Sequence, residues 1–485
     1  MCLTTMAFAL FASLLLHVYY RAPGKHQWKI LLGASLLFYL WAGLKYAVFL
    51  AVTAGSSFLA AAFMERNRTA GASGKNRALL LGCMVLNFGM LAFCKVCLLL
   101  PEKGGFLALA LPMGISFYVF QSMGYVIDVY RGREGETSFF RYLLFVSWFP
   151  QLIQGPISKY ADLAHPLTEP HPYDRQTLCF GLQRMLWGYF KKLVIADRVA
   201  PAVAALRTAQ PSGASFFLLT LLYALQLYAD FTGGMDIVLG LSQSLGITLS
   251  ENFRRPFFSK NIAEYWRRWH ITLGTWMREY IFFPVSISKP VRRLCTPVRK
   301  RFHKLGRRLP VYISSAVTWF VTGIWHGLTP NFLLWGMLNC TVIVLSEELS
   351  PLYRKFHNRF GWKQKKWYAA FEILRTFLLM NLIRACDLFP KVGEYFRGIG
   401  SLLGPWWWGE LELGFSPWDY GIVALGILLM VFVSVVQEKG ISLRRQLWEK
   451  PLLRELGNGA LLLMILLLGQ YGVGYDPSSF IYNQF

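Results

Sequence analysis

The sequence predicts an all-α protein that crosses a membrane many times, and three observations support this fold class. Of its 485 residues, 55% are hydrophobic and only 16% are charged, whereas soluble domains carry roughly a quarter charged residues. The chain also contains repeated uncharged stretches of about 20 residues, the length that a helix needs to cross the hydrocarbon core. Finally, basic residues gather in the short connections between these stretches, as the positive-inside rule describes.

Membrane helices are expected wherever the chain runs without charge for about 20 residues. In chain order, such runs lie at 1–20, 46–64, 106–127, 208–229, 311–346, 420–437 and 457–475, and the run at 311–346 is long enough for two helices. Shorter or slightly charged candidates lie at 30–44, 78–100, 142–158 and 368–390. Together these runs predict about eleven membrane helices, with some re-entrant segments. The first run lacks the basic flank and cleavage site of a signal peptide, so we interpret it as a retained helix.

The chain is expected to form a single membrane domain over residues 1–485, because no linker divides it into globular parts. Within this domain, residues 1–100 form N-terminal helices and residues 101–345 form a catalytic core. Residues 366–485 form a C-terminal group of helices after a basic, aromatic connection.

The core is unusual because Gly, Pro, Asp and His interrupt its apolar runs at 111–132, 147–160 and 228–240. Broken backbone at membrane depth is tolerated where it lines a water-filled cavity or is buried in protein. We therefore expect a central cavity in this part of the chain. Asp230 and Asp236 are candidate substrate-binding residues of its wall, and capping of broken helices is the alternative role for both.

The net charge of +24 arises from 50 Lys and Arg against 26 Asp and Glu. In a soluble protein this excess would suggest nucleic acid, but here membrane lipid is the expected partner, and no nucleic acid is expected. The largest cluster, at 288–308, has nine Lys and Arg and no acidic residue, so we expect it in the cytoplasm or at an anionic leaflet. The eight cysteines show no spacing typical of a metal site, and no metal is expected.

The stretch at 251–284 is strongly basic and rich in tryptophan. Its spacing from Ile262 onward is helical, which places Trp266, Trp269 and His270 close to one face. Two interpretations remain open. The stretch is either an interfacial amphipathic helix with a tryptophan belt, or the mouth of a cavity that accepts an anionic donor. In the second case, the candidate substrate-binding residues are Trp269, Arg267 and Arg268.

One ionisable side chain, His326, lies in the middle of the uncharged run at 311–346. An ionisable residue at membrane depth is a functional hypothesis by default, although a neutral imidazole can also bond two helices together. Gly323 and Gly327 permit close backbone approach, and a helix break follows directly. A neutral imidazole there can take a proton from a hydroxyl, as a general base does. Its neighbour Trp325 is a further candidate substrate-binding residue.

Two of these motifs together resemble a known family. YWRRWHITLGTW at 265–276, followed by TGIWHG at 322–327, is similar to the membrane-bound O-acyltransferases (MBOAT). The resemblance is to the bacterial branch of AlgI-like polysaccharide O-acetylation proteins and DltB-like D-alanyl transfer proteins, and it is closer to the AlgI type. Further similar stretches are FYVFQSMGYVIDVYRG (117–132), WFPQLIQGPI (148–157), ENFRRPFFSKNI (251–262) and the C-terminal FIYNQF.

This resemblance implies a ring of helices around a central funnel, in which a cytoplasmic acyl donor meets an acceptor from outside. By position, His326 corresponds to the catalytic histidine and His270 to a second histidine that supports the reaction. The implied donor is a thioester, either acetyl-CoA or an acylated carrier protein, and no bound cofactor is implied. At residues 328–331 the chain reads LTPN where the AlgI type usually has Ala-x-Trp, so a tryptophan of the funnel wall is missing.

The implied acceptor is a hydroxyl of an extracellular polysaccharide, reached directly or through an extracytoplasmic SGNH-type acyltransferase. The implied location is the bacterial cytoplasmic membrane, with many crossings. Three other functions remain as alternatives: D-alanyl transfer to teichoic acid, transport of a polysaccharide or acyl carrier without chemistry, and a structural subunit that docks a separate transferase. Neither of the last two needs a pair of histidines.

Overall fold

The structure is a computed structural model that describes residues 2–97, 112–209, 212–407, 413–472, 475–476 and 480. The described residues fold almost entirely into helices and contain no strand, which confirms the all-α class. Parts of the predicted runs at 78–100, 106–127, 208–229 and 457–475 lie outside the described residues. The same is true of the C-terminal motif after Phe480.

The chain divides into two compact units. The first unit consists of Met1–Val194, Asp230–Ser250 and Leu443–Gln484. Its helices are α1 (Met6–Arg21), α2 (Gly24–Ala42), α3 (Leu44–Thr69), α4 (Asn76–Cys97), α5 (Ile115–Tyr130), α6 (Phe139–Ser147), α7 (Phe149–Gln154), α8 (Tyr160–Thr168), α9 (Arg175–Tyr189), α22 (Leu443–Trp448) and α23 (Pro451–Leu468). A π-helical turn, η3 (Phe190–Ala196), follows α9.

The second unit consists of Ile195–Ala229 and Glu251–Ser442. Its helices are α10 (Asp197–Thr208), α12 (Ile262–Arg268), α13 (Ile271–Met277), α14 (Phe283–Ile287), α15 (Lys289–Arg301), α16 (His303–His326), α17 (Pro330–Glu348), α18 (Ser350–Phe360), α19 (Lys366–Arg384), α20 (Val392–Ser401) and α21 (Pro417–Glu438). The π-helical turn η5 (Arg278–Phe282) joins α13 to α14, and the short helix η7 (Ala385–Leu388) follows α19. The long helix α11 (Gly213–Ser244) contributes to both units.

The predicted runs correspond to helices, but fewer of these are long enough to span a membrane than expected. Among the described residues, α3, α4, α11, α21 and α23 have the necessary length and apolar composition. A sixth span results if α17 and α18, which meet at an angle of 51°, are counted as one. The predicted run at 142–158 is divided at Trp148 into the short helices α6 and α7. The prediction that the chain contains several membrane helices is thus confirmed. The count of about eleven membrane helices and their arrangement in a ring stay predictions.

Glycines bring α9 and the second half of α11 into close contact in the first unit. A Cβ atom placed on Gly188 would lie 2.6 Å from the carbonyl oxygen of Gly233, and one on Gly181 would lie 2.5 Å from that of Gly240. The two contacts lie seven residues apart on each helix, so they occupy the same face of each. Small residues of this kind allow membrane helices to pack backbone against backbone.

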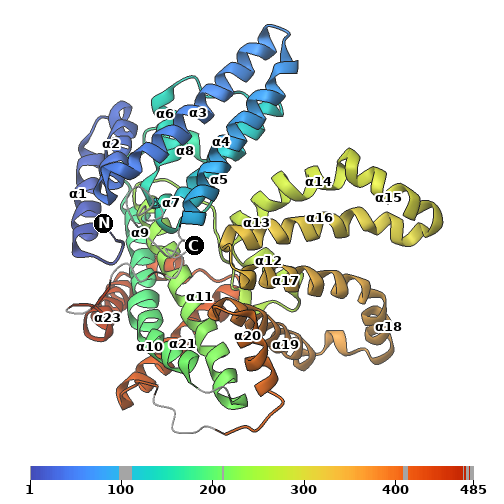
Figure 1. Cartoon of the computed structure of the whole chain (residues 1–485). Coiled ribbons are helices and arrows are strands. Elements are labelled where there is room, and N and C mark those ends of the chain that lie inside the picture. Colours follow the sequence, from blue (N-terminus) through green and yellow to red (C-terminus); the bar gives the residue numbers. More distant parts are fainter. Residues whose placement is uncertain are drawn as a thin grey trace. The chain divides into compact units, whose positions relative to one another are not determined.

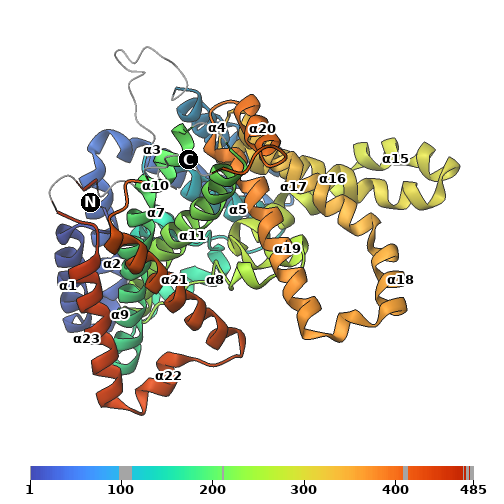
Figure 2. The ribbon, with the colours of Figure 1, turned by 90° about the horizontal axis from the view of Figure 1, so that it is seen from below.

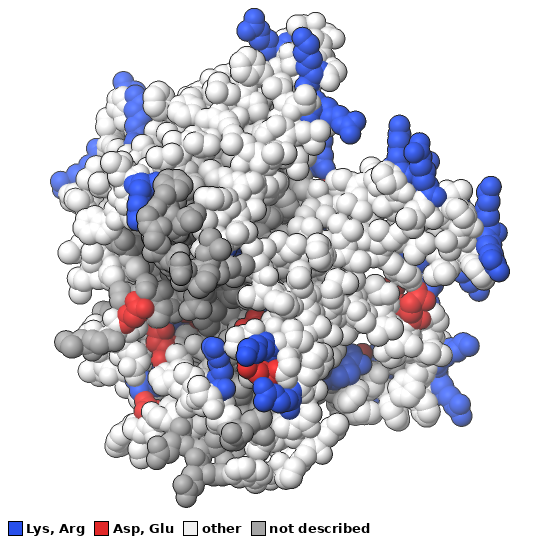
Figure 3. Space-filling view, viewed as in Figure 1, with Lys and Arg blue, Asp and Glu red and all other residues white. Residues whose placement is uncertain are grey.

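The two helices at 289–326 form a hairpin in the second unit, with α15 and α16 side by side in both ribbon views (Figure 1, Figure 2). A Cβ atom on Gly306 would lie 2.2 Å from the Cα atom of Arg299, so the helices nearly touch. The nine Lys and Arg of 288–308 cover the outer part of this hairpin, where Figure 3 shows blue side chains at the right of the view. The apolar half of α16 continues from there to the helix end.

Candidate active site

His326 is the last residue of α16, at the point where the chain turns into α17. The backbone N–H of Gly327 still donates to the carbonyl oxygen of Gly323, at 3.0 Å, before the helix ends. A Cβ atom on Gly323 would lie 2.7 Å from the carbonyl oxygen of Phe332, so glycine is needed where α16 and α17 cross. This packing encloses the imidazole of His326, which is only 7% exposed.

Aromatic rings surround His326 on several sides. Its ring centroid lies 4.8 Å from that of Trp335 and 4.9 Å from that of Trp325, both edge to face. Phe332 lies nearly parallel to the imidazole, at 6.2 Å and 15°. Trp319 in turn packs on Trp335, with centroids 5.9 Å apart. The environment of the imidazole is therefore dense and apolar.

His270 lies in a break between α12 and α13, so the prediction of one continuous helix from residue 262 was wrong. An isolated bridge joins Trp269 to Phe253. His270 itself adopts the left-handed conformation, with φ 47°, and caps the N-terminus of α13. The chain leaves the helix here because its backbone pairs with residues 252–254, and helical periodicity in the sequence cannot reveal such a partner.

The imidazole of His270 is 2% exposed. Its Nδ1 atom lies 3.3 Å from Oδ1 of Asn252. Burial and, as a smaller effect, the nearby positive charge of Arg384 together lower the pKa of His270 to about 3. The imidazole is therefore neutral at physiological pH.

The structure brings the two predicted histidines into contact with one indole. The ring centroid of Trp325 lies 5.9 Å from that of His270 and 4.9 Å from that of His326. Trp269, the residue before His270, is buried and stacks on Tyr265 at 5.7 Å and 11°. His270, His326, Trp325 and Trp269 thus form one cluster within the second unit.

Arg384, at the end of α19, belongs to the same cluster, and the sequence analysis missed it. Its side chain is buried, and the guanidinium carbon lies 4.7 Å from the ring centroid of Trp269 and 5.5 Å from that of Trp335. Its distance to the carboxylate of Asp387, 3.9 Å, is long for an ion pair. The signal in the sequence was weak, because the run at 368–390 carries a second arginine, Arg375, as well as Arg384.

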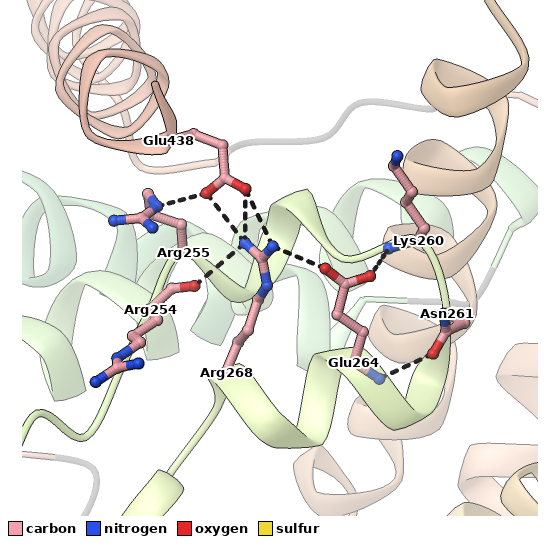
Figure 4. A network of polar contacts seen from close by, with 7 residues as sticks. All are labelled: Arg254, Arg255, Lys260, Asn261, Glu264, Arg268 and Glu438. Carbon is pink, nitrogen blue, oxygen red and sulfur yellow. Dashed lines mark hydrogen bonds and ion pairs between the residues drawn. The ribbon is translucent and has the colours of Figure 1, made fainter. Parts of the chain in front are cut away.

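The two arginines that were predicted to bind an anionic donor differ in their surroundings. The side chain of Arg268 bonds both oxygens of Glu438 at 3.0 Å and pairs with Glu264 at 2.7 Å (Figure 4). Arg255 joins the same group through Glu438, at 2.6 Å. Arg267 is exposed. The role of both predicted arginines in substrate binding stays a prediction, and Arg268 already holds two carboxylates in place.

The two predicted aspartates lie in the first unit, within α11. Asp230 pairs with Lys192 of η3 at 2.6 Å, and both side chains are buried. Asp236 pairs with Lys191 at 2.6 Å and with Arg184 of α9 at 2.8 Å. The predicted helix break at 228–240 is absent, because α11 runs without interruption to Ser244. Its glycines serve helix packing instead, and substrate binding by the aspartates stays a prediction.

Within the described ranges, no group of three His, Cys, Asp or Glu side chains is placed to hold a metal ion. The cluster brings together two imidazoles and a guanidinium among indoles. An imidazole can accept a proton from a hydroxyl, and a buried cation can stabilise negative charge that develops during a reaction.

Comparison with known proteins identifies relatives of the chain. Residues 127–294 match the model of the MBOAT, membrane-bound O-acyltransferase family. The chain is 32% identical over 356 residues to a probable alginate O-acetylase AlgI from Azotobacter vinelandii. The matched region covers 70% of this chain and 67% of that protein. It is 28% identical over 430 residues to a peptidoglycan O-acetyltransferase from Helicobacter pylori, with 77% of each chain covered.

A third relative, a teichoic acid D-alanyltransferase from Bacillus subtilis, is 24% identical over 273 residues. That match covers 55% of this chain and 65% of the relative. By their names, two of these relatives transfer acetyl groups, to alginate and to peptidoglycan, and the third transfers D-alanyl groups to teichoic acid.

Proposed function

The chain belongs to the membrane-bound O-acyltransferase family, and on that premise we propose that it transfers an acetyl group from a cytoplasmic thioester to hydroxyls of a cell-surface polysaccharide. The observation that carries this proposal is the placement of His326 and His270 against the same indole, inside an apolar cluster. The similarity to an alginate O-acetylase supports the choice of acetyl group and polysaccharide.

In the proposed reaction, His326 acts as the general base. Its neutral imidazole takes the proton of an acceptor hydroxyl while the hydroxyl oxygen attacks the thioester carbonyl carbon. The carbon–sulfur bond then breaks, and the proton passes on to the leaving thiolate. The indoles of Trp325 and Trp335 exclude water, which would otherwise hydrolyse the donor. A central cavity that admits donor and acceptor from opposite sides is part of this proposal.

His270 supports the reaction as a second neutral imidazole. Acetyl-CoA or an acylated carrier protein is the proposed donor, and the bacterial cytoplasmic membrane is the proposed location. The acceptor is reached directly or through an extracytoplasmic SGNH-type transferase. A gene for such a secreted enzyme beside the gene of this chain would support acetylation of a polysaccharide.

The experiment that tests the proposal compares His326→Ala with the wild type in a bacterial strain that lacks its own copy of the chain. Acetate released from surface polysaccharide by mild base is measured, with His17→Ala on the exposed face of α1 as the control. Because general-base catalysis contributes about 10²–10⁴-fold, His326→Ala should reduce the acetate by about that factor while the protein stays in the membrane. Wild-type acetylation by this variant would contradict the role of His326.

D-Alanyl transfer to teichoic acid is a second candidate, which the similarity to a teichoic acid D-alanyltransferase favours. The same base treatment distinguishes the two functions, because it would release D-alanine in place of acetate. A transporter without chemistry predicts that His326→Ala keeps full surface acylation by a separate enzyme. A structural subunit predicts the same result.

A further inference from the structure

We propose that Asn252 is a positioning residue that holds His270 in the tautomer with the proton on Nδ1, so that Nε2 is the basic nitrogen. The catalytic consequence of this inference rests on the function proposed above, but the tautomer itself does not. Asn252 lies at the start of the stretch at 251–284, and no pattern in the sequence singles it out.

Three groups converge on the side-chain oxygen of Asn252, which is fully buried. The backbone N–H of Thr272 donates to this Oδ1 atom at 3.0 Å, and the hydroxyl of Thr272 donates to it at 3.0 Å. Nδ1 of His270 lies 3.3 Å away. The asparagine backbone takes part as well, because its carbonyl oxygen accepts from the N–H of Ile271 at 3.0 Å.

These contacts determine which atom carries the proton. A backbone N–H can only donate, so the atom of the Asn252 amide that faces Thr272 must be the oxygen. An amide oxygen can only accept, so Nδ1 of His270 must be the donor in their contact. In a neutral imidazole, the other nitrogen then carries the lone pair. The orientation of one amide therefore fixes the tautomer of His270.

The surrounding charges keep this imidazole neutral. Arg384 of α19 is the charged group that faces His270, and it opposes a second proton on the ring. From α16, the ring is faced by the uncharged indole of Trp325. A neutral ring with its lone pair on Nε2 can accept a proton or a hydrogen bond, but it cannot donate one from Nε2. His270 thus assists as a hydrogen-bond acceptor through Nε2, and not as a donor to the thioester carbonyl.

The backbone holds the ring in place for this role. The left-handed conformation of His270 costs roughly 1 kcal/mol or more for a residue with a Cβ atom. It persists because the chain is paired on both sides, with the N–H of Arg254 donating to the oxygen of Arg268 at 2.9 Å and Ile271 bonded to Asn252. Backbone strain of this kind is retained where contacts on both sides hold the residue in its conformation.

The first test reads the tautomer by solid-state NMR of the full chain in lipid bilayers, labelled with ring-¹⁵N histidine. The chain has eight histidines, and the signals of His270 are assigned by their loss in His270→Gln. We expect a protonated Nδ1 and an unprotonated Nε2 at neutral pH. A proton on Nε2, or on both nitrogens, would overturn the proposal.

Two substitutions then test the part played by Asn252. Asn252→Leu removes the acceptor and should give a mixture of tautomers or the Nε2–H form. Asn252→Asp keeps an acceptor, so the Nδ1–H tautomer should be restored. Its added negative charge favours the imidazolium, so His270 should protonate at a higher pH than in the wild type. An unchanged tautomer in Asn252→Leu would also overturn the proposal.

The third measurement links the tautomer to acyl transfer, with the base-released acetate assay in cells. Asn252→Leu should lower the rate of acyl transfer about 10- to 100-fold, which is less than the full rate enhancement of a positioned acid–base group. Asn87→Leu is the matched control, because Asn87 of α4 is equally buried and hydrogen-bonded within the first unit. If NMR confirms the tautomer but Asn252→Leu and His270→Ala both transfer at the wild-type rate, the tautomer stands and the proposed role of His270 is wrong.

Discussion

The imidazole of His270 meets the indole of Trp325 edge to face, with their ring centroids 5.9 Å apart. The same indole adjoins His326, so its removal should affect both histidines together. We expect Trp325→Ala to reduce acyl transfer more than Trp325→Phe, which keeps an aromatic ring beside the two imidazoles. The acetate assay checks this order, and Trp367→Ala, at an exposed tryptophan of α19, serves as the control. Equal activity of Trp325→Ala and Trp325→Phe would argue against a role for the ring.

Arg384 should be needed for the reaction because it is the buried cation of the cluster. Loss of a group that stabilises developing negative charge typically costs about 10²–10³-fold in rate, so Arg384→Gln should lower transfer by about that factor. Arg384→Lys keeps the charge without the planar fork and should fall between Arg384→Gln and the wild type. Arg375→Gln, on the exposed face of the same helix, is the control.

Arg384→Gln also leaves the buried carboxylate of Asp387 without its pair, which by itself is destabilising. The double variant Arg384→Gln/Asp387→Asn removes both charges and should recover thermal stability in detergent. Its acyl transfer should stay low. Full recovery of transfer in the double variant would mean that Arg384 serves stability alone.

Gly188 should not tolerate a side chain, because a Cβ atom there meets the backbone of α11. Overpacking of this kind costs about 1–3 kcal/mol, so we expect Gly188→Ala to lower the melting temperature of the purified protein. Gly459→Ala in α23 is the matched control, since a Cβ atom at that position meets no atom within 4 Å. An alanine in a helix interior is favoured over glycine by about 0.5–1 kcal/mol, so the control should be neutral or stabilising.

The basic hairpin of α15 and α16 should face the cytoplasm, because the nine Lys and Arg of 288–308 follow the positive-inside rule. The native Cys295 is buried, so the exposed neighbour Thr296 is the better site for labelling. An impermeant maleimide should label Thr296→Cys in inverted membrane vesicles and not in intact cells. The unsubstituted chain gives the background signal. Labelling in intact cells would place the hairpin outside.

The sequence was sufficient to predict the helical class and the approximate position of most helices. It also singled out two histidines that the structure places against one indole, and their catalytic role stays a prediction. Apolar runs locate helices because length and hydropathy are local properties, and a histidine within such a run is visible without a structure. The turn after His326 was visible for the same reason, since Gly and Pro follow it. By contrast, the number of spans depends on where each helix ends, which packing decides.

Two features of the site and one of the helix packing could not be predicted from the sequence. Asn252 and Arg384 adjoin His270 only through the fold. Neither belongs to a spacing pattern that local analysis detects. The glycines of α11 were interpreted as a break, although the structure uses Gly233 and Gly240 for contact with α9. A glycine that permits close packing and one that ends a helix look alike in a sequence, and only the neighbouring helix distinguishes them.

The left-handed backbone of His270 places a conformational cost on every residue with a Cβ atom at this position. Glycine adopts φ 47° without strain, whereas His270→Ala keeps the strain, and both variants empty the same buried space. In a library of variants sorted by the amount of folded protein, glycine should therefore rank above alanine at this position. In a library sorted by surface acylation, both should rank below histidine, because neither has an imidazole.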